Sequence, residues 1–428
     1  MKGCAGKAGA GTMPASHGVF SGAPQDAVRI AGRGRGWGPA VRGEQSEKPV
    51  PATSALERSG RALRIAVLSS TPPNPLEGSG TFVGIAGLAR GLAALGHEVE
   101  LRPLGWRTRL HTLDRWLYNL GVALSPPRGS DLVMGVDLDG FLWARRRRTP
   151  FVASLKGIIA DELKNERGWV RMLLGVQARW ERLNARRADL VMVTSRYCAE
   201  VAQREYGVPE DRIAVVPEAI DLAAWDDQFA RAQRRPRQGP VVLSVARMYP
   251  RKRLGDLLRA GAILRGRIVD AQVRIVGRGP EWEPLGRLHA ELGLGDSARL
   301  LGDLSRERLA EEYVNADLFC LPSVQEGFGI VFLEAMAAGL PVVACRAAAV
   351  PEVVLEGVTG VLTPPRDPAA LALALEGLLR DPGRAGRLGA EGRRRAAGFT
   401  PRHVAERFLD AVRSSVFARC NRNSLEAH

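Results

Sequence analysis

Short apolar runs recur along the chain after the first sixty residues, and polar or glycine-rich stretches separate them. The runs at 63–69, 131–136 and 188–195 have the length and largely continuous apolar character of strands that are buried on both faces. A helical pattern at 82–95 follows the first run and ends at Gly96, a residue that commonly closes a helix. This alternation predicts an α/β fold with parallel strands, and its first half begins like a nucleotide-binding domain.

The same order of elements restarts near residue 240 and predicts a second domain. A polar, arginine-rich stretch at 226–238 precedes it and is typical of a linker between domains. Helical patterns at 367–379 and 401–416 follow in the last part of the chain. Strands are predicted in this half at 240–245, 271–276, 299–304, 318–321 and 341–344, and helices at 254–264 and 330–338.

The first sixty residues differ from the rest. Twelve of them are Gly, the piece Gly32-Arg-Gly-Arg-Gly36 is of low complexity, and no helical or strand period is visible. We expect a disordered extension, with contact between the Arg-Gly piece and RNA as the alternative. The predicted segments are an extension at 1–60, a first domain at 61–225, the linker at 226–238, a second domain at 239–395, and a final helix and tail at 396–428.

Composition narrows the class of partner. The chain has 61 Lys and Arg against 46 Asp and Glu, a formal charge of +15, which favours nucleic acid, anionic lipid headgroups or phosphorylated substrates. No helix-turn-helix, zinc finger or RNA-binding aromatic pattern occurs, so we expect no specific nucleic-acid binding. The five cysteines are scattered without a Cys-x-x-Cys, so no metal site is expected and a reduced cytoplasm fits best. The sequence contains no run of about 18 apolar residues, so no transmembrane helix is expected.

A basic amphipathic helix is predicted at 168–187, with Trp169 and Trp180 among its apolar residues. Two interpretations of this pattern are open. The helix packs on its own sheet, which is the simpler explanation, or it rests on an anionic membrane with tryptophan at the interface.

The stretch from 323 to 343 holds the most specific chemistry. The turn Gly327-Phe-Gly329 follows a predicted strand and precedes a predicted helix, with Glu326 before the turn and Glu334 inside the helix. Backbone N–H groups and the positive end of the helix dipole would therefore meet two carboxylates at the end of the strand. That arrangement suits a phosphate with a hydroxyl-rich group beside it.

The longer pattern resembles a known family. Glu326-Gly-Phe-Gly329, followed by Glu334-Ala-Met-Ala-x-Gly339-x-Pro341-Val, is similar to the signature of the retaining, nucleotide-sugar-dependent glycosyltransferases of family 4. The resemblance spans about 63–412 and is closer in the second half. It implies the GT-B fold, in which two Rossmann-like domains face a central cleft, the first on the acceptor side and the second binding the donor.

The resemblance also implies roles for residues of the donor side. Relatives carry Gly-Arg-x4-Lys, which this chain matches at Arg247 and Lys252 with Ala246 in place of Gly. Two cations there would offset the charge that develops on a departing nucleoside diphosphate. Glu326 would bind donor sugar hydroxyls and Glu334 the ribose hydroxyls. A loop with three prolines and Gly78-Ser-Gly80 is expected after the first strand, where the family has a loop over the donor diphosphate. The other donor-side candidates are Gly78, Gly80, Gly277, Arg278, Gly327, Phe328 and Gly329.

On the acceptor side the chain departs from the family pattern. Many relatives carry His-Gly where this chain has Lys156-Gly157, and Val-Pro-Asn-Gly where it has Val-Pro-Glu218-Ala. A protonated Lys only donates hydrogen bonds, so no general base is assigned at Lys156, which we expect to neutralise a phosphate or carboxylate of donor or acceptor. Asp139 and Arg196 follow predicted strands and are further candidates for this side of the cleft.

The sequence therefore predicts a retaining glycosyltransferase that moves a sugar from an NDP-sugar to a glycan, lipid or small-molecule acceptor. No metal or other cofactor is expected, and the predicted location is cytoplasmic, with peripheral contact at the inner face of the membrane as a further expectation. A non-catalytic GT-B-like scaffold, or a basic protein on membrane or nucleic acid, is the alternative. A nucleotide-sugar epimerase or a phosphorylase is a third option.

Overall fold

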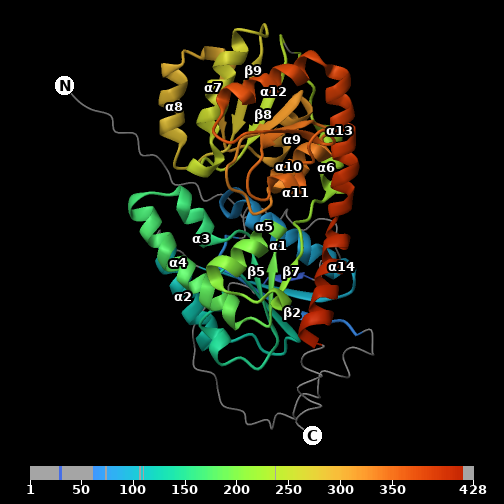
Figure 1. The fold of residues 1–428 in the computed structure, drawn as a ribbon. Helices are drawn as coiled ribbons and strands as arrows, with labels where there is room; N and C mark the ends of the chain where they lie inside the picture. Colours follow the sequence, from blue (N-terminus) through green and yellow to red (C-terminus); the bar gives the residue numbers. More distant parts are fainter. Residues whose placement is uncertain are drawn as a thin grey trace, which may run out of the picture.

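The computed structural model describes residues 28–30, 61–72, 75–105, 108, 110–236 and 238–417. Its two sheets lie in two domains stacked end to end (Figure 1). The strand orders are β1-β3-β2-β4-β5-β6-β7 in the first domain and β10-β9-β8-β11-β12-β13 in the second. All neighbouring strands within each sheet run parallel, as their continuous apolar character predicts. The GT-B architecture expected from the sequence, two Rossmann-like domains, is confirmed.

Helices cover both faces of the first sheet, so its central strands β4, β5 and β6 are buried on both sides. One apolar cluster joins α1 and α14 to the sheet, and a second cluster joins α2, α4 and α5 to the opposite face. The strands are β1 (Val28–Ile30), β2 (Arg64–Ser69), β3 (Glu98–Pro103), β4 (Leu132–Val136), β5 (Phe151–Leu155), β6 (Leu190–Val193) and β7 (Ile213–Val215). The helices are α1 (Pro75–Ala94), α2 (His111–Leu124), α3 (Ile159–Glu162), α4 (Gly168–Arg187), α5 (Arg196–Val201) and α14 (Pro401–Val412).

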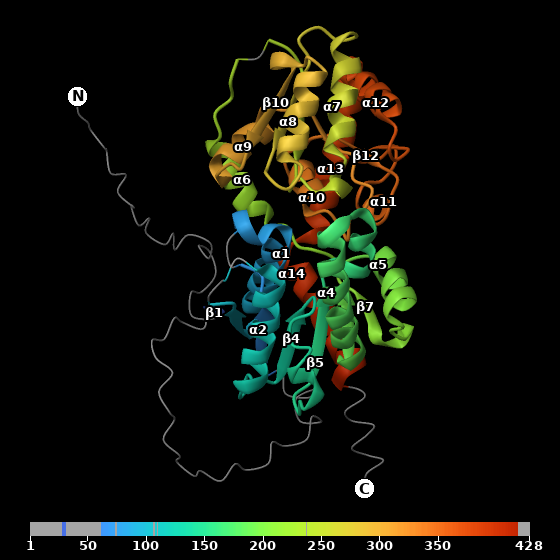
Figure 2. The same cartoon turned by 90° about the vertical axis from the view of Figure 1, so that its left-hand side faces the viewer.

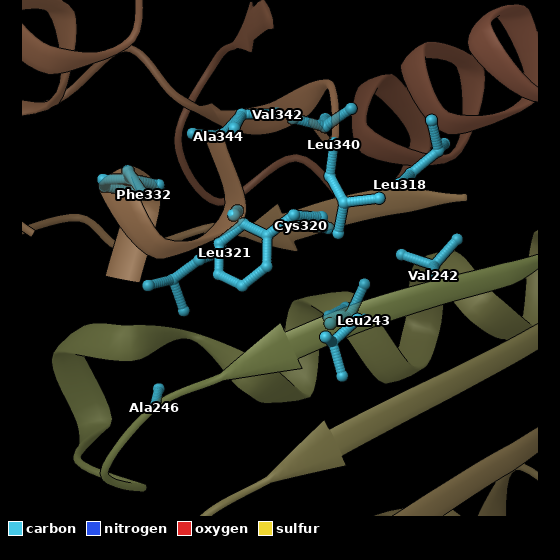
Figure 3. Packing of buried hydrophobic residues seen from close by; sticks show 14 of the residues in the cluster. Val242, Leu243, Ala246, Leu318, Cys320, Leu321, Phe332, Leu340, Val342 and Ala344 are labelled. Atoms are coloured by element: carbon cyan, nitrogen blue, oxygen red, sulfur yellow. The ribbon is translucent and has the colours of Figure 1, made fainter. Parts of the chain in front are cut away.

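The second domain has one large core. Figure 3 shows side chains of β8, β11 and β12 packed in one cluster that includes Phe332 of α10, and Phe332 is fully buried. The strands are β8 (Val241–Val245), β9 (Gln272–Val276), β10 (Ala298–Gly302), β11 (Leu318–Leu321), β12 (Val342–Cys345) and β13 (Gly360–Thr363). The helices are α6 (Leu222–Arg231), α7 (Leu254–Arg265), α8 (Trp282–Glu291), α9 (Arg306–Val314), α10 (Ile330–Ala337), α11 (Val350–Val353), α12 (Pro368–Arg380) and α13 (Pro382–Ala396).

The last helix of the described chain leaves the second domain and returns to the first. In Figure 1, α13 and α14 run down one side of the molecule from the upper domain to the lower one. The backbone of α14 approaches α1 so closely that a Cβ at Gly91 would lie 1.9 Å from the Pro401 carbonyl oxygen. Phe408 of α14 is fully buried in the core of the first domain.

Three predicted boundaries need correction. Disorder over 1–60 is wrong at 28–30, where the backbone of β1 pairs in parallel with the edge of β3; the other residues before 61 lie outside the described ranges. The expected loop at 78–80 is wrong, because α1 already begins at Pro75, a residue suited to the first turn of a helix. The predicted linker at 226–238 contains the second half of α6. In the described part of the chain, no helix combines the length and apolar character needed to cross a membrane.

Candidate active site at the domain interface

The glycine turn lies between β11 and α10, where the two domains meet. Gly329 caps α10 with a left-handed backbone, φ 91°, and a Cβ there would lie 2.6 Å from the ring of Phe332. Only glycine satisfies both conditions, so the tight turn into α10 requires glycine at position 329. Glu326 stands just before this turn and is buried at its edge. The Phe328 side chain packs edge-on against Phe399, so Phe328 offers the site its backbone.

A close ion pair joins the two donor-side motifs. Lys252 ends the 3₁₀ turn Pro250–Lys252 after β8, and its Nζ lies 2.6 Å from Oε1 of Glu326. Both side chains are largely buried, with exposed fractions of 13% and 8%. The structure therefore brings together two of the three predicted catalytic residues, which are 74 positions apart in sequence.

Arg251, which the sequence did not single out, reaches across the interface. Its Nη2 lies 3.6 Å from Oε1 of Glu162 in the first domain, and its guanidinium stacks over Tyr249. Burial lowers the pKa of Arg251, but the carboxylates of Glu162 and Glu326 outweigh burial and raise it above its usual value. Arg251 is therefore a fixed cation between the domains, and its place directly before Lys252 is the only sequence signal that could have pointed to it.

The first domain contacts the glycine turn directly. A Cβ at Gly327 would lie 2.5 Å from the Lys156 carbonyl oxygen and 3.2 Å from the Cα of Gly157. The Thr194 hydroxyl, at the end of β6, donates to the Gly327 carbonyl over 2.9 Å. The expected opposite wall at Lys156-Gly157 is thus in contact with the turn. Thr194 was missed, because a threonine at a strand end has no distinctive pattern.

Glu334 lies inside α10, in the fifth position of the helix, and is buried. The Tyr313 hydroxyl donates to its Oε2 over 3.0 Å. Burial raises the pKa of Glu334 to about 7, against smaller lowering effects of the Tyr313 hydroxyl and the Arg306 charge. This carboxyl group is therefore poised between its protonated and ionised forms near neutral pH.

The turns after β8 and β9 touch each other and carry the remaining donor-side candidates. Gly277 has φ 117°, and a Cβ there would lie 2.1 Å from the Ala246 carbonyl oxygen, directly beside Arg247. Arg278 stacks on the Trp282 ring, with 4.2 Å between its Cζ and the ring centroid. Gly277, Arg278 and Arg247 thus share one edge of the sheet, as parallel strands predict.

The first domain contributes α1 to the same interface. Gly78 and Gly80 lie in the first turns of this helix, and a Cβ at Gly80 would lie 3.5 Å from Cγ2 of Ile330, the first residue of α10. Gly80 therefore faces the beginning of α10 from the opposite domain, although from a helix and not from the loop that was expected.

Lys156 and Glu218 form a buried ion pair, with 2.9 Å between Nζ and Oε1 and exposed fractions of 8% for both side chains. The Glu218 carboxylate lies against α1 at Gly84, where a Cβ would be 2.0 Å from Oε2. Lys156, which we expected to neutralise a group of the donor or acceptor, is thus paired with a carboxylate of its own chain. The two departures from the family pattern, at positions 156 and 218, are thus one structural unit.

Asp139 does not line the cleft, contrary to our expectation. It is fully buried and accepts hydrogen bonds from the backbone and hydroxyl of Ser70 and from Asn119. Burial raises its pKa to about 6, while the neighbouring Arg115 lowers it. Asp139 therefore belongs to an internal polar network and is not an open carboxylate.

Arg196 lies at the interface through its backbone. The N–H groups of Arg196 and Tyr197, at the start of α5, donate to the two carboxylate oxygens of Glu352 over 2.9 and 2.8 Å. Glu352 belongs to α11 of the second domain, so this contact ties the two domains together. Glu352 was missed in the sequence, where it is an ordinary glutamate after a proline.

Family models of known proteins match both halves of the chain. A family model described as "Glycosyl transferases group 1" matches residues 226–395, and one described as "Glycosyltransferase Family 4" matches residues 128–224. The chain belongs to glycosyltransferase family 4. These matches cover the glycine turn, the Lys252 turn and the Lys156–Glu218 pair.

The names of curated relatives of this family 4 chain indicate several different acceptors. The chain is 36% identical over 56% of its length to a GDP-mannose-dependent alpha-(1-6)-phosphatidylinositol monomannoside mannosyltransferase of Mycolicibacterium smegmatis, covering 65% of that protein. It is 38% identical over 54% of its length to a D-inositol 3-phosphate glycosyltransferase of Nocardia farcinica, covering 53% of it. An MMP alpha-(1->4)-mannosyltransferase of Mycolicibacterium hassiacum is 29% identical, over 78% of this chain and 93% of that protein.

Solved structures support the fold of the family 4 chain. Sucrose-phosphate synthase from Thermosynechococcus elongatus superposes with a TM-score of 0.69 at 23% identity, over 83% of this chain and all of the other. Anabaena Alr3699/HepE in complex with UDP and glucose superposes with a TM-score of 0.64 at 21% identity, over 82% of this chain and all of the other.

Proposed function

We propose that this protein is a retaining glycosyltransferase that transfers a sugar from an NDP-sugar to an acceptor held against the first domain. The observation that carries the proposal is the contact of Lys252 with Glu326 beside the glycine turn, at the place where the other domain closes on Gly327. A cation, a carboxylate and the N-terminus of α10 converge there from separate segments of the chain.

Each group has a chemical role in the proposed reaction. Arg247 and Lys252 stabilise the diphosphate as it leaves, together with the amides of 327–329 and the dipole of α10. Glu326 binds the donor sugar hydroxyls, and Glu334 binds the ribose hydroxyls. Because no side chain is assigned as a nucleophile, the acceptor attacks from the face that the diphosphate leaves, and the departing phosphate takes the acceptor proton.

The named substrates of the relatives indicate which donors and acceptors to try first. Two of the relatives described above carry mannosyltransferase in their names, one with GDP-mannose as donor, and the HepE structure holds UDP and glucose. Inositol-containing acceptors occur in two relatives. The proposal therefore keeps the donor open between UDP- and GDP-sugars and includes no metal ion or other cofactor.

Replacing Arg247 with Ala tests the proposal. We expect the barrier to transfer to rise by about 2 to 4 kcal/mol, since a donor that stabilises developing charge is lost. The measurement is product formation with UDP-glucose, UDP-GlcNAc and GDP-mannose over phosphatidylinositol, inositol phosphate and sugar acceptors. Arg308→Ala, which removes an exposed arginine on α9, is the matched control and should keep wild-type turnover. Unchanged turnover in Arg247→Ala, or no binding of UDP or GDP by the wild type in calorimetry, would overturn the proposal.

A further inference from the structure

The outer faces of α2 and α4 hold most of the exposed apolar side chains of the described residues. Thirteen large hydrophobic side chains are exposed among the described residues, and nine of them belong to α2, its capping residue or α4. Contiguous exposed apolar side chains commonly mark a surface that meets a partner or a membrane. The nine are Leu110, Leu113, Trp116, Leu124, Trp169, Val170, Met172, Val176 and Leu183.

Apart from Val170, these side chains lie on the sides of α2 and α4 that face away from the sheet. Buried residues of α2 and α4, among them Tyr118 and Ala185, belong to the core cluster on one face of the first sheet. Gln177 of α4 donates to Thr112 and accepts from Arg115, so the two helices are neighbours. Their opposite sides therefore both face outward from that sheet face, and Figure 2 looks onto these two helices.

Four of the five exposed apolar residues of α4 form a single stripe, which Val170 lies outside. At about 100° per residue, Trp169, Met172, Val176 and Leu183 fall within an arc of roughly 60°. Trp169 and Met172 are 66% and 59% exposed, so the first turns of the helix stand clear of the core. The middle of α4 thus packs on its sheet, as the simpler interpretation predicts, and its outer stripe is exposed.

The charge beside the stripe has one sign. Exposed arginines of α4 lie along one flank of the apolar residues, whereas Glu181, the single acidic residue of this helix, is fully buried. Asp114 of α2 is also buried and accepts hydrogen bonds from Thr108. An anionic surface therefore meets cations and no exposed carboxylate on either helix. The exposed arginines of α4 are Arg171, Arg179, Arg182 and Arg186.

We propose that the outer face of α2 and α4 docks on an anionic phospholipid bilayer, with Trp169 and Met172 inserted at the headgroup level and the arginines on lipid phosphates. A surface helix with apolar residues on one side and arginine beside them lies in the plane of a membrane, and each basic residue near an anionic surface adds to the attraction. This inference stands on exposed side chains and charge, and it does not depend on the proposed transferase activity.

Vesicle binding by the full chain tests the proposal. The wild type should sediment with vesicles of phosphatidylcholine and phosphatidylglycerol, bind phosphatidylcholine alone at least tenfold more weakly, and release from the mixed vesicles at high salt. Trp169→Ser/Met172→Ser should lower partitioning about tenfold or more with an unchanged melting temperature, since both side chains are exposed. Arg179→Gln/Arg182→Gln should remove the preference for the anionic lipid, because it removes positive charge and leaves the apolar side chains in place.

Leu373→Ser is the matched control, because Leu373 of α12 is 58% exposed on the other domain and should leave vesicle binding unchanged. The proposal is overturned if the wild type binds both vesicle types equally or not at all, or if Leu373→Ser weakens binding as much as Trp169→Ser/Met172→Ser. It is also overturned if sedimentation velocity shows a dimer that Trp169→Ser/Met172→Ser abolishes while the wild type ignores vesicles. That result would assign the face to a second copy of the chain.

Discussion

At the scale of single residues, the Lys156–Glu218 pair shows what local patterns cannot convey. The lysine follows β5 and the glutamate follows β7, 62 positions later, and each looks like an isolated departure when the sequence is read alone. Only the fold places them 2.9 Å apart, away from water and against α1. A charge on one side of the cleft was predictable, but its compensation by the same chain was not.

Removing one member of this pair should cost more than removing both. Lys156→Met leaves the buried Glu218 carboxylate without its cation, so we expect a loss of about 3 to 5 kcal/mol in the free energy of unfolding. Lys156→Met/Glu218→Leu replaces the pair by apolar groups and should lie much closer to the wild type. Chemical denaturation of both single variants and the double variant measures the coupling. Additive losses in the double variant would show that the two residues do not stabilise each other.

The buried carboxyl group of Glu334 makes the free energy of unfolding depend on pH. Burial raises its pKa to about 7 in the folded protein, above that of an unfolded glutamate, so the folded state holds more protons between about pH 4.5 and 7. Stability from this group is therefore present at low pH and is lost as pH rises through 7.

Glu334→Gln removes that loss and should raise the free energy of unfolding by about 1 to 3 kcal/mol at pH 8. The gain should vanish near pH 5, where the wild-type carboxyl is protonated. Thermal unfolding of the variant and the wild type at both values measures it. An equal effect at the two pH values would mean that the carboxyl does not titrate in this range.

At the scale of elements, the turn between β11 and α10 was the most predictable part of the site. Its glycines, the strand before it and the helix after it all lie where the sequence indicates, because tight turns have strict backbone requirements. By contrast, α2 went unpredicted, and α1 begins seven residues before the expected start at 82. Both misses lie near proline- and glycine-rich stretches, where local preference favours loops and tertiary packing decides otherwise.

Gly327→Ala should separate the domains at this turn without unfolding either one. The added Cβ would lie 2.5 Å from the Lys156 carbonyl oxygen, which is backbone of the other domain and cannot rotate away. We expect a loss of at least tenfold in kcat/KM for sugar transfer, because reacting groups on the two sides no longer reach each other.

Gly377→Ala provides the control for that change. No atom lies within 4 Å of a Cβ at Gly377 in α12, so activity should persist and stability should rise by about 0.5 to 1 kcal/mol. Wild-type kcat/KM in Gly327→Ala would show that this contact is not needed for transfer.

At the scale of the whole molecule, polar contacts join the two domains. Glu352 accepts two backbone hydrogen bonds from α5, and Arg251 faces Glu162 across the same interface. None of these was foreseen, because contacts between domains depend on how the two sheets are set against each other. The two domains and their order were foreseen, because each repeats the strand and helix pattern.

Glu352→Ala should shift the protein towards a more open arrangement. The N–H groups of Arg196 and Tyr197 lose their carboxylate, so we expect a larger radius of gyration in X-ray scattering while each domain keeps its fold. Glu356→Ala is the control, since Glu356 pairs with Arg346 inside the second domain. An unchanged radius in Glu352→Ala would show that the other contacts suffice to hold the domains together.

The return of α14 to the first domain has a consequence for exchanging parts between relatives. Because Phe408 completes the core of that domain and Gly91 accommodates the backbone at Pro401, the unit that folds together is not continuous in sequence. A chimera that takes 61–220 from a relative must also take 400–417, or it will join an α1 from one parent to an α14 shaped for the other. An exchange of the first domain between relatives therefore needs two segments of the gene, with the second domain encoded between them.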